Sequence, residues 1–488
     1  MVTASVDTDK IPELCAGSIL VAGAGVSGVG MAHLLMDMHA DVTVADDDEI
    51  KRDRVTESTG ARTMTVSDAI DQLLTFKLVV TSPGWNPRTA LLVTATELGI
   101  PVIGDVELAW RIDQSGVFGP PRTWIGITGT NGKTTTTAMV TAMLTAPQSV
   151  SPHAVAVGNI GLAVGEALTQ TNPRADILVA ELSSFQLHWS STLHPHVGTV
   201  LNLADDHIDW HGDFTHYADA KAKVLNADIP LVNADDPRVV AYAPKAIGYT
   251  LQPPQPGQVG VDGGYIVDWA FQAAGETGDQ PVPIAPIDSI SPPGIAGLSD
   301  AVAATAVARA LGTPAEQIAR ALRHFTVASH RGGVVWDGGG LAFVDNSKAT
   351  NPHAAQTVLQ GLDHYVWIGG GQLKGADVTD LVTEHGPHMR AAILMGVDRH
   401  ELADAFARYS PATPVYLVDE TDGVTAMREV VQRAIDVAHT GDAVVLAPAG
   451  ASLDMYTGMS ERGNLFAEAA RALAPATGSS TSEGSISS

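Results

Sequence analysis

The residues best suited to bind a phosphate stand in one glycine-rich segment, residues 128–134, which reads TGTNGKT. Two glycines allow successive backbone N–H groups to turn toward an anion. Lys133 supplies a positive charge for the terminal phosphates of a nucleotide, and the Thr134 hydroxyl is a suitable Mg²⁺ ligand. Ile127 stands where a strict phosphate-binding loop has its first glycine. The nucleotide-binding candidates are Thr128, Gly129, Thr130, Asn131, Gly132, Lys133, Thr134 and Thr135.

More polar residues follow this segment, and each stands near the end of an expected strand or on a helix: Asn159, Glu181, His207 and Lys221. Ligands in open α/β sheets bind at the carboxyl ends of strands, so a carboxylate after the apolar run 177–180 is well placed for Mg²⁺. Taken singly, each residue has an ordinary structural explanation, such as a turn, a helix cap or an exposed helix face. Together, in this order behind a phosphate loop, they predict a metal–nucleotide site.

An earlier segment, residues 23–28, reads GAGVSG between an apolar strand at 18–22 and a helix through Met38. A second strand, 42–45, ends at Asp46. This is the fingerprint of a βαβ unit that brings its backbone close to a phosphate or sugar. A nicotinamide dinucleotide is one candidate ligand, and another molecule with a diphosphate and a ribose is favoured over it.

The composition excludes several functions for this chain of 488 residues. A formal net charge of −26 disfavours nucleic-acid and anionic-membrane binding. No apolar run reaches the ~18–20 residues of a membrane span, and the N-terminus lacks a signal-peptide pattern. The single cysteine, Cys15, excludes an internal disulfide. These features predict a cytoplasmic protein.

Apolar strands alternate with helical stretches along most of the chain, which predicts three α/β domains with parallel-dominated sheets. Residues 243–291 are rich in glycine and proline with short strands between, which predicts a small antiparallel β insert. Thr313 is expected to cap a helix that opens with Pro314, with Glu316 completing a capping box. The predicted divisions are 1–117, 118–327 and 328–475, followed by a disordered tail at 476–488.

The ordered set of motifs resembles that of the Mur ligase family over residues 15–474. The motifs are TGTNGKT at 128–134, GNIG at 158–161, ELSSFQL at 181–187, DH at 206–207, Lys221, NADD at 233–236, HR at 330–331 and SKATN at 347–351. Any one of these motifs is weak evidence for the family, but the ordered set is highly specific for it. The ELSSFQL and SKATN segments are similar to those of the members that add D-glutamate.

The resemblance implies a Rossmann-like N-terminal domain that binds a UDP-linked substrate. It also implies a central P-loop ATPase-type domain and a Rossmann-like C-terminal domain that binds the amino acid. The catalytic residues would be Lys133, Glu181, His207 and Lys221, and the metal ligands Thr134, Glu181, His207 and Lys221 as a carbamate. Further ATP contacts would come from Asp300, Arg331 and Asn346. The UDP-substrate positions would be Val26, Ser27, Asp46, Asp47, Asn159 and Ser183. The D-glutamate positions would be His330, Lys348, Thr350, Ser452 and Met459.

Three of these positions depart from the usual residues of the family. Asp345-Asn346 stands where Asn-Asp or Asp-Asp is usual, so the carboxylate expected at the ATP ribose is moved by one residue or lost. Asp300 replaces an asparagine that contacts adenine, and Met459 replaces a phenylalanine of the glutamate pocket.

The activity implied by the resemblance is ATP-dependent amide formation between the L-alanyl carboxylate of UDP-N-acetylmuramoyl-L-alanine and D-glutamate, in peptidoglycan precursor synthesis. ATP and Mg²⁺ would be the cofactors, an acyl phosphate the intermediate, and the protein a monomer without nucleic-acid or membrane partners. Two alternatives stay open: a nicotinamide-dependent dehydrogenase, and a noncatalytic scaffolding or regulatory protein that keeps the ligase fold.

Overall fold

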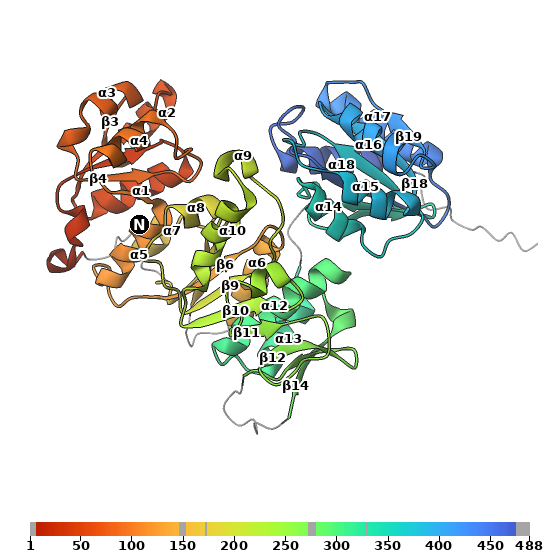
Figure 1. Cartoon of the computed structure of the whole chain (residues 1–488), viewed down its shortest axis with the longest axis horizontal. Coiled ribbons are helices and arrows are strands. Elements are labelled where there is room, and N and C mark those ends of the chain that lie inside the picture. The colour runs from red at the N-terminus through yellow and green to blue at the C-terminus, as the bar shows by residue number, and fades with distance from the viewer. Residues whose placement is uncertain (1–5, 146–152, 171–172, 272–279, 327–329, 475–488) are drawn as a thin grey trace, which may run out of the picture. The chain divides into compact units, whose positions relative to one another are not determined.

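The computed structural model describes residues 6–145, 153–170, 173–271, 280–326 and 330–474. The chain divides into two compact units, Met1–Ile290 with Ser299–Phe325 and Ser291–Leu298 with Thr326–Ser488. Within the described residues, the first unit holds sheets of five and nine strands, and the second holds a sheet of six (Figure 1). The predicted α/β class is therefore confirmed, and the exact domain boundaries stay predictions. The predicted disordered tail lies outside the described residues.

The first sheet is parallel, in the order β3-β2-β1-β4-β5. The strands are β1 (Ser18–Ala22), β2 (Asp41–Ala45), β3 (Arg62–Met64), β4 (Leu78–Thr81) and β5 (Val102–Gly104). The helices are α1 (Val26–Asp37), α2 (Glu49–Thr59), α3 (Val66–Asp71), α4 (Ala90–Glu97) and α5 (Asp105–Ser115). The strand β4 is buried throughout, as expected for a parallel strand covered on both faces.

The second sheet has the order β14-β13-β12-β11-β10-β9-β6-β8-β7 and places β6 between β8 and β9. Its first strands are β6 (Thr123–Thr128), β7 (Ala154–Gly158), β8 (Ile177–Glu181), β9 (Val197–Val200) and β10 (Ile229–Asn233). The helices are α6 (Lys133–Leu144), α7 (Val164–Thr169), α8 (Ser184–His188), α9 (Ile208–His211), α10 (Phe214–Ala222), α11 (Pro237–Val240), α12 (Ile295–Ala310) and α13 (Ala315–His324). The β6–α6 connection carries the predicted phosphate loop.

The glycine-rich and proline-rich stretch predicted as a β insert extends this same sheet. Its strands are β11 (Ile247–Tyr249), β12 (Gln258–Asp262), β13 (Tyr265–Asp268) and β14 (Val282–Pro286). The pairs β12–β13 and β13–β14 are antiparallel, as predicted, whereas β11 and β12 continue the parallel part.

One expected helix cap is wrong. The helix α13 has Pro314 as its N-cap, and no side chain caps it. The backbone of Thr313 is used instead to close the preceding helix, because its N–H donates to Ala308 and its carbonyl accepts from the buried Arg309 guanidinium. A long-range ion pair holds that guanidinium, whose Nε lies 2.6 Å from Asp268. Tertiary contacts have therefore outweighed the local capping preference.

The third sheet has the order β15-β16-β20-β17-β18-β19, with only β15 antiparallel to its neighbour. Its strands are β15 (Gly333–Gly338), β16 (Leu341–Asp345), β17 (Tyr365–Gly370), β18 (Met389–Met395), β19 (Val415–Leu417) and β20 (Ala443–Ala449). The helices are α14 (Pro352–Leu359), α15 (Thr379–His385), α16 (Arg399–Tyr409), α17 (Gly423–Val437) and α18 (Met459–Leu473). No helix in the described part of the chain is long and apolar enough to cross a membrane.

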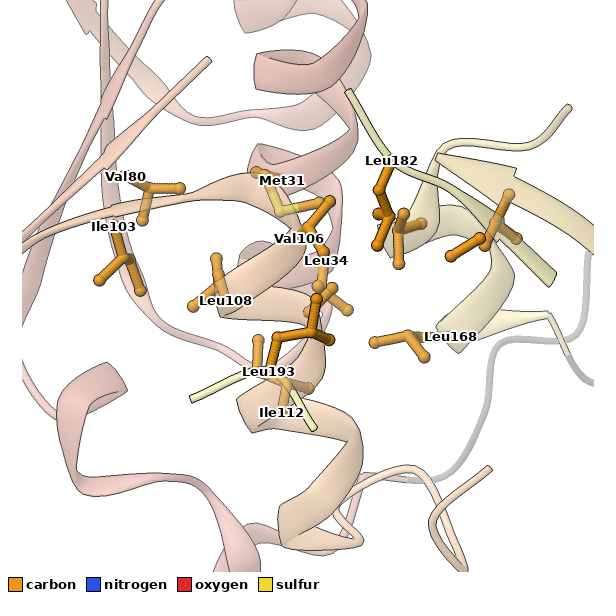
Figure 2. Close-up of a cluster of buried hydrophobic side chains, with 14 of the residues drawn as sticks. Met31, Leu34, Val80, Ile103, Val106, Leu108, Ile112, Leu168, Leu182 and Leu193 are labelled. Carbon is orange, nitrogen blue, oxygen red and sulfur yellow. The ribbon is translucent and has the colours of Figure 1, made fainter. Parts of the chain in front are cut away.

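A single hydrophobic core joins the first two sheets and explains why they form one unit. Met31 and Leu34 of α1 and Ile112 of α5 pack in one buried cluster with Leu168 of α7 and Leu182 after β8 (Figure 2). Burying one such side chain contributes roughly 1.5–3 kcal/mol. The two sheets therefore behave as one packed body.

A buried carboxylate reinforces this junction. Glu107 of α5 accepts hydrogen bonds from the N–H and hydroxyl groups of Ser191 and Thr192, at 2.7–3.1 Å, and from Arg111 Nε at 2.8 Å. Burial opposes the charge, but these donors outweigh it and hold the pKa of Glu107 below its usual value of 4.5. The ionised form is therefore the one that the folded state prefers.

We expect Glu107→Gln to lower the free energy of unfolding by about 1–3 kcal/mol at pH 7, because the added amide N–H₂ faces donors. The folded pKa of Glu107 is depressed, so its stabilising contribution is complete above pH 4.5 and declines as the pH falls through the folded value. Urea unfolding of both proteins from pH 7 to pH 3 should show the difference shrinking below about pH 4.5. A difference that stays constant to pH 3 would contradict this account of the junction.

Candidate functional site

The phosphate loop lies between the carboxyl ends of two neighbouring strands. The register aligns Ile127 with Glu181 of β8 and Thr128 with Val200 of β9. Gly132, at φ +80°, is the N-cap of α6, so the loop turns directly into the positive end of a helix. A Cβ atom at this glycine would lie 2.2 Å from Asp300 Oδ1. The loop conformation therefore needs glycine here.

Two residues that the sequence analysis did not select hold this loop in place. The Asn202 carboxamide accepts from the Asn131 N–H at 2.8 Å and donates to the Asn131 carbonyl at 3.2 Å. The Tyr217 hydroxyl lies 2.8 Å from Thr130 Oγ1, which also contacts the Ala204 carbonyl. Their only sequence signal is a position just after a strand or on the helix that carries Lys221. Both are positioning residues for the loop.

Two lysine amines meet at one carbonyl oxygen of the loop. Lys133 Nζ donates to the carbonyls of Gly129 and Thr130, at 2.9 and 2.8 Å. Lys221 Nζ reaches the same Gly129 oxygen at 2.7 Å and Thr128 Oγ1 at 3.2 Å. Two ammonium ions at one oxygen repel each other, so their proximity favours a neutral form of at least one.

Of the two lysines, Lys221 is the one whose surroundings favour the neutral amine. It is buried, and Tyr217 lies beneath its Nζ at 4.9 Å from the ring centre. Burial, followed by the charge of Lys133, lowers the pKa of Lys221 well below its ordinary value, and Asp206 and Glu181 oppose that shift only in part. A neutral amine is a nucleophile, so this lysine is chemically suited to capture CO₂.

Glu181 presents an unsatisfied carboxylate oxygen at the same sheet edge. Asn159 Nδ2 donates to Glu181 Oε1 at 2.9 Å, and the Asn159 N–H donates to the Glu181 carbonyl, also at 2.9 Å. Oε2 is buried and has no hydrogen-bond partner among the described residues. Such an oxygen fits a hard cation such as Mg²⁺.

The protein alone does not complete a metal site here. No group of three or more His, Cys, Asp or Glu side chains that could hold a metal occurs in the described parts of the chain. A Mg²⁺ ion bound near Glu181 would therefore take other ligands as well, and phosphate oxygens with the Thr134 hydroxyl suit it. This arrangement is typical of nucleotide-dependent metal binding.

His207 and Ser183 lie on the rim of this region. His207 adopts φ +54° as the N-cap of α9, and its ring centre lies 4.6 Å from that of Phe185. Ser183 caps α8 in a capping box with Gln186. His211 Nε2 lies 3.0 Å from Ser184 Oγ, and burial lowers the pKa of His211 to about 4. His211 is therefore neutral at physiological pH.

Four of the six predicted UDP-substrate positions, Val26, Ser27, Asp46 and Asp47, lie at the carboxyl edge of the first sheet, whereas Asn159 and Ser183 follow strands of the second. Val26 and Ser27 open α1, and the Val26 side chain is 85% exposed. Asp46 Oδ2 accepts the Ala24 N–H at 2.8 Å, and Asp47 Oδ1 accepts the Val66 N–H at 3.0 Å. Asp46 therefore fixes the glycine-rich loop through Ala24, and the exposed Val26 side chain lies directly after that loop.

The predicted amino-acid positions, with Arg331 and Asn346, belong to the second unit. His330 Nδ1 lies 2.6 Å from Asp345 Oδ2, and the Lys348 N–H donates to the His330 carbonyl at 3.3 Å. Ser347 Oγ donates to the Met459 carbonyl at 2.7 Å. The loop after β16 carries Lys348 and Thr350, and the loop after β20 carries Ser452, whereas His330 precedes β15 and Met459 is the first residue of α18.

A fully buried arginine, which the sequence analysis also missed, ties those loops together. Arg462 of α18 donates to the hydroxyl and carbonyl of Ser347, at 3.1 and 2.8 Å, and to the Gly450 carbonyl at 3.1 Å. Burial lowers the pKa of Arg462 to about 10, so it stays protonated at neutral pH. It joins the segment before Lys348 to the segment before Ser452.

We expect Gly132→Ala to abolish most of the rise in melting temperature that Mg²⁺ and a nucleoside triphosphate produce, because the methyl group displaces Asp300 and its contact with Thr136. Gly60→Ala is the matched control. Gly60 also has a positive φ, +74°, but a Cβ atom there would meet nothing within 4 Å. The positive φ costs each variant about 1–2 kcal/mol of stability. Gly132→Ala should lose more, because its methyl group also clashes with Asp300. Equal nucleotide-induced shifts in the two variants would contradict the assignment of the loop.

Three family models match consecutive parts of the chain. They are a Mur ligase MurD-like N-terminal domain at residues 17–104, a Mur ligase middle domain at 127–252, and a Mur ligase glutamate ligase domain at 330–450. Among solved structures, MurF from Acinetobacter baumannii aligns with a TM-score of 0.59 at 14% identity, over 96% of this chain and 99% of that one. A pseudomurein peptide ligase type C from Methanothermus fervidus gives 0.55 at 16%, over 93% and 99%. These two likenesses support the fold alone.

Relatives of similar length carry one name, UDP-N-acetylmuramoylalanine–D-glutamate ligase. The protein of Corynebacterium efficiens is 51% identical over 96% of this chain and 97% of its own length. That of Corynebacterium diphtheriae is 50% identical over 96% and 98%, and that of Mycobacterium bovis is 42% identical over 93% and 96%. With the three domain matches in order, these identities show that the chain belongs to the Mur ligase family.

Proposed function

We propose that this chain is an ATP-dependent ligase that joins the L-alanyl carboxylate of UDP-N-acetylmuramoyl-L-alanine to the amine of D-glutamate, releasing ADP and phosphate, in cytoplasmic peptidoglycan precursor synthesis. The observation that carries the proposal is the group at the carboxyl edge of the second sheet. There a phosphate loop, the unpaired oxygen of Glu181 and the buried amine of Lys221 meet. The names of the relatives supply the two substrates.

The first chemical step would bring two anions together, because the substrate carboxylate attacks the γ-phosphate of ATP. The carboxylate oxygen bonds to phosphorus, ADP leaves, and an acyl phosphate forms. Lys133, together with the loop N–H groups and the start of α6, would hold and neutralise the phosphates. The amine of D-glutamate then attacks the acyl carbon, and phosphate leaves with one oxygen of the former carboxylate.

Mg²⁺ would be held by Thr134, Glu181 and His207, with Lys221 as a carbamate, and it would supply charge neutralisation at the phosphates. Addition of CO₂ to the neutral Lys221 amine, with loss of a proton, would place an anion at this buried position. Asn159 fixes the Glu181 carboxylate on one side and leaves its other oxygen for the ion. In the second unit, Lys348 would pair with a carboxylate of D-glutamate, and the Arg462 contacts would fix the loop that carries it.

The proposal is tested by phosphate release from ATP with UDP-N-acetylmuramoyl-L-alanine as acceptor and a panel of D- and L-amino acids. Release that depends on D-glutamate is expected. Release without any amino acid, or none with D-glutamate, would overturn the proposed reaction. A larger rise in melting temperature with NADH than with the UDP substrate would favour the dehydrogenase alternative.

Lys133→Ala should lower kcat about 10²-fold or more, by analogy with the loss of one preorganised donor in a site of developing charge. The quantity to measure is kcat with saturating substrates, alongside the far-ultraviolet circular dichroism of the folded protein. Lys223→Ala is the control, because that amine bonds the carbonyls of Leu187, His188 and Ser190 and does not touch the loop. Retention of near-wild-type turnover by Lys133→Ala would defeat the assignment.

Lys221→Ala should be almost inactive and should regain part of its turnover with added acetate, since a small carboxylate can replace the carbamate. In the unmodified protein, [¹³C]bicarbonate should give a carbamate carbon resonance that is absent from Lys221→Ala. If neither rescue nor the resonance is observed, Lys221 acts as an amine and the carbamate is wrong.

A further inference from the structure

A buried carboxylate outside the predicted site connects the two sheets of the first unit at the level of their ligand-binding edges. Asp105 is the first residue of α5, in the first sheet's domain, and is 5% exposed. Its Oδ1 accepts the Val106 N–H at 2.9 Å, and its Oδ2 accepts from Gln186 Nε2 at 3.5 Å. Burial raises the pKa of this carboxyl group, and the nearby Ser27 hydroxyl acts to lower it. Each of these partners acts as a donor, so the contacts suit a carboxylate.

Gln186 links Asp105 to the domain of the second sheet. It lies in α8 and is almost fully buried. The side-chain oxygen of Gln186 accepts the Ser183 N–H at 3.0 Å and the Ser183 hydroxyl at 3.2 Å. The backbone N–H of Gln186 donates to Ser183 Oγ at 3.2 Å. Its side-chain nitrogen turns to Asp105. One amide therefore bonds both Ser183 and the carboxylate of the other domain.

The surroundings keep this connection rigid. The Gly104 N–H donates to the Trp189 carbonyl at 3.2 Å, and a Cβ atom at Gly104 would lie 2.9 Å from Trp189 Cβ. Two residues further along α5, Glu107 accepts hydrogen bonds from Ser191 and Thr192. Burial raises the pKa of Asp105, because a buried charge is destabilising. A carboxyl group therefore lowers the stability of this domain junction, which is already well packed. Packing alone gives no reason for it.

We propose that Asp105 and Gln186 are positioning residues that set the distance between the two ends of the UDP-linked substrate's site. Ser27 is expected at the UDP end, and Ser183 is expected near the end that reacts with ATP. The chain Ser27–Asp105–Gln186–Ser183 fixes one hydroxyl relative to the other across the domain junction. The inference rests on the proposed function, because it assumes that one elongated substrate spans both serines.

Asp105→Asn tests the connection, because its amide N–H₂ would face the N–H₂ of Gln186 while its oxygen still accepts the Val106 N–H. We expect the KM for UDP-N-acetylmuramoyl-L-alanine to rise about tenfold, which corresponds to one hydrogen bond to a buried charged group, with the KM for ATP changed less than about twofold. Gln186→Met should shift the same KM in the same direction. It leaves the carboxylate in place and serves if Asp105→Asn does not fold.

The double variant Asp105→Asn/Gln186→Glu reverses the polarity of the contact, since the asparagine amide now donates to the glutamate carboxylate. It should recover the KM for the UDP substrate to within about threefold of wild type. Glu107→Gln is the matched control. It weakens the same junction but touches neither Ser27 nor Gln186, so it should lower the melting temperature and leave the ratio of the two KM values unchanged.

The possible results separate cleanly. If Asp105→Asn lowers stability as Glu107→Gln does, with an unchanged ratio of KM values, or if the double variant shows no recovery, Asp105 is only a structural residue and the inference is wrong. If the wild-type protein releases no phosphate with D-glutamate, the proposed function fails instead. In that case the melting-temperature rise with the UDP substrate alone, in wild type and Asp105→Asn, still reports on positioning.

Discussion

The structure depends most on the burial of one amine at the carboxyl edge of the second sheet. Lys221 lies in a place where an ammonium ion would be poorly solvated and would face a second lysine at the same carbonyl oxygen. A buried charge of this kind is destabilising unless it is paired or neutralised. The site therefore favours a neutral amine, and conversion to a carbamate would give this position a negative charge. The glycine-rich loop contacts this amine directly, and the Glu181 carboxylate, one oxygen of which has no hydrogen-bond partner among the described residues, acts on its charge.

The register of the parallel strands brings the residues of the candidate site together. Because β6 lies between β8 and β9, residues that are some 50 to 90 positions apart in the sequence end in one row. Asn159 joins that row through the next strand, whose Gly158 pairs with Glu181. This explains how Asn159, Glu181 and the glycine-rich loop, which are far apart in the sequence, lie at one edge of the sheet. Polar residues directly after apolar strands can be recognised locally, and parallel sheets place all such ends on one edge.

The residues that the sequence did not predict share a different property. Asn202, Tyr217, Asp105 and Arg462 act through partners that are distant in the chain, and no local pattern identifies those partners. The same limit explains the wrong helix cap at Thr313. The Thr313 carbonyl accepts from Arg309, whose guanidinium is held in turn by the distant Asp268. It also explains why β11 and β12 continue the central sheet, since edge pairing depends on which strand is available. The local sequence pattern predicted the helices and strands well, whereas the long-range polar contacts could be identified only in the folded structure.

The central claim is that the substrate's carboxylate is activated by phosphorylation in the site built around Lys133 and Lys221. Transfer of oxygen reports on this directly. UDP-N-acetylmuramoyl-L-alanine labelled with ¹⁸O in its alanyl carboxylate would be converted with D-glutamate, ATP and Mg²⁺, and the phosphate released would be analysed by mass spectrometry. The account predicts one ¹⁸O atom in each phosphate formed, because the acyl phosphate breaks at the carbon–oxygen bond. Phosphate without label, formed together with the amide product, would contradict it.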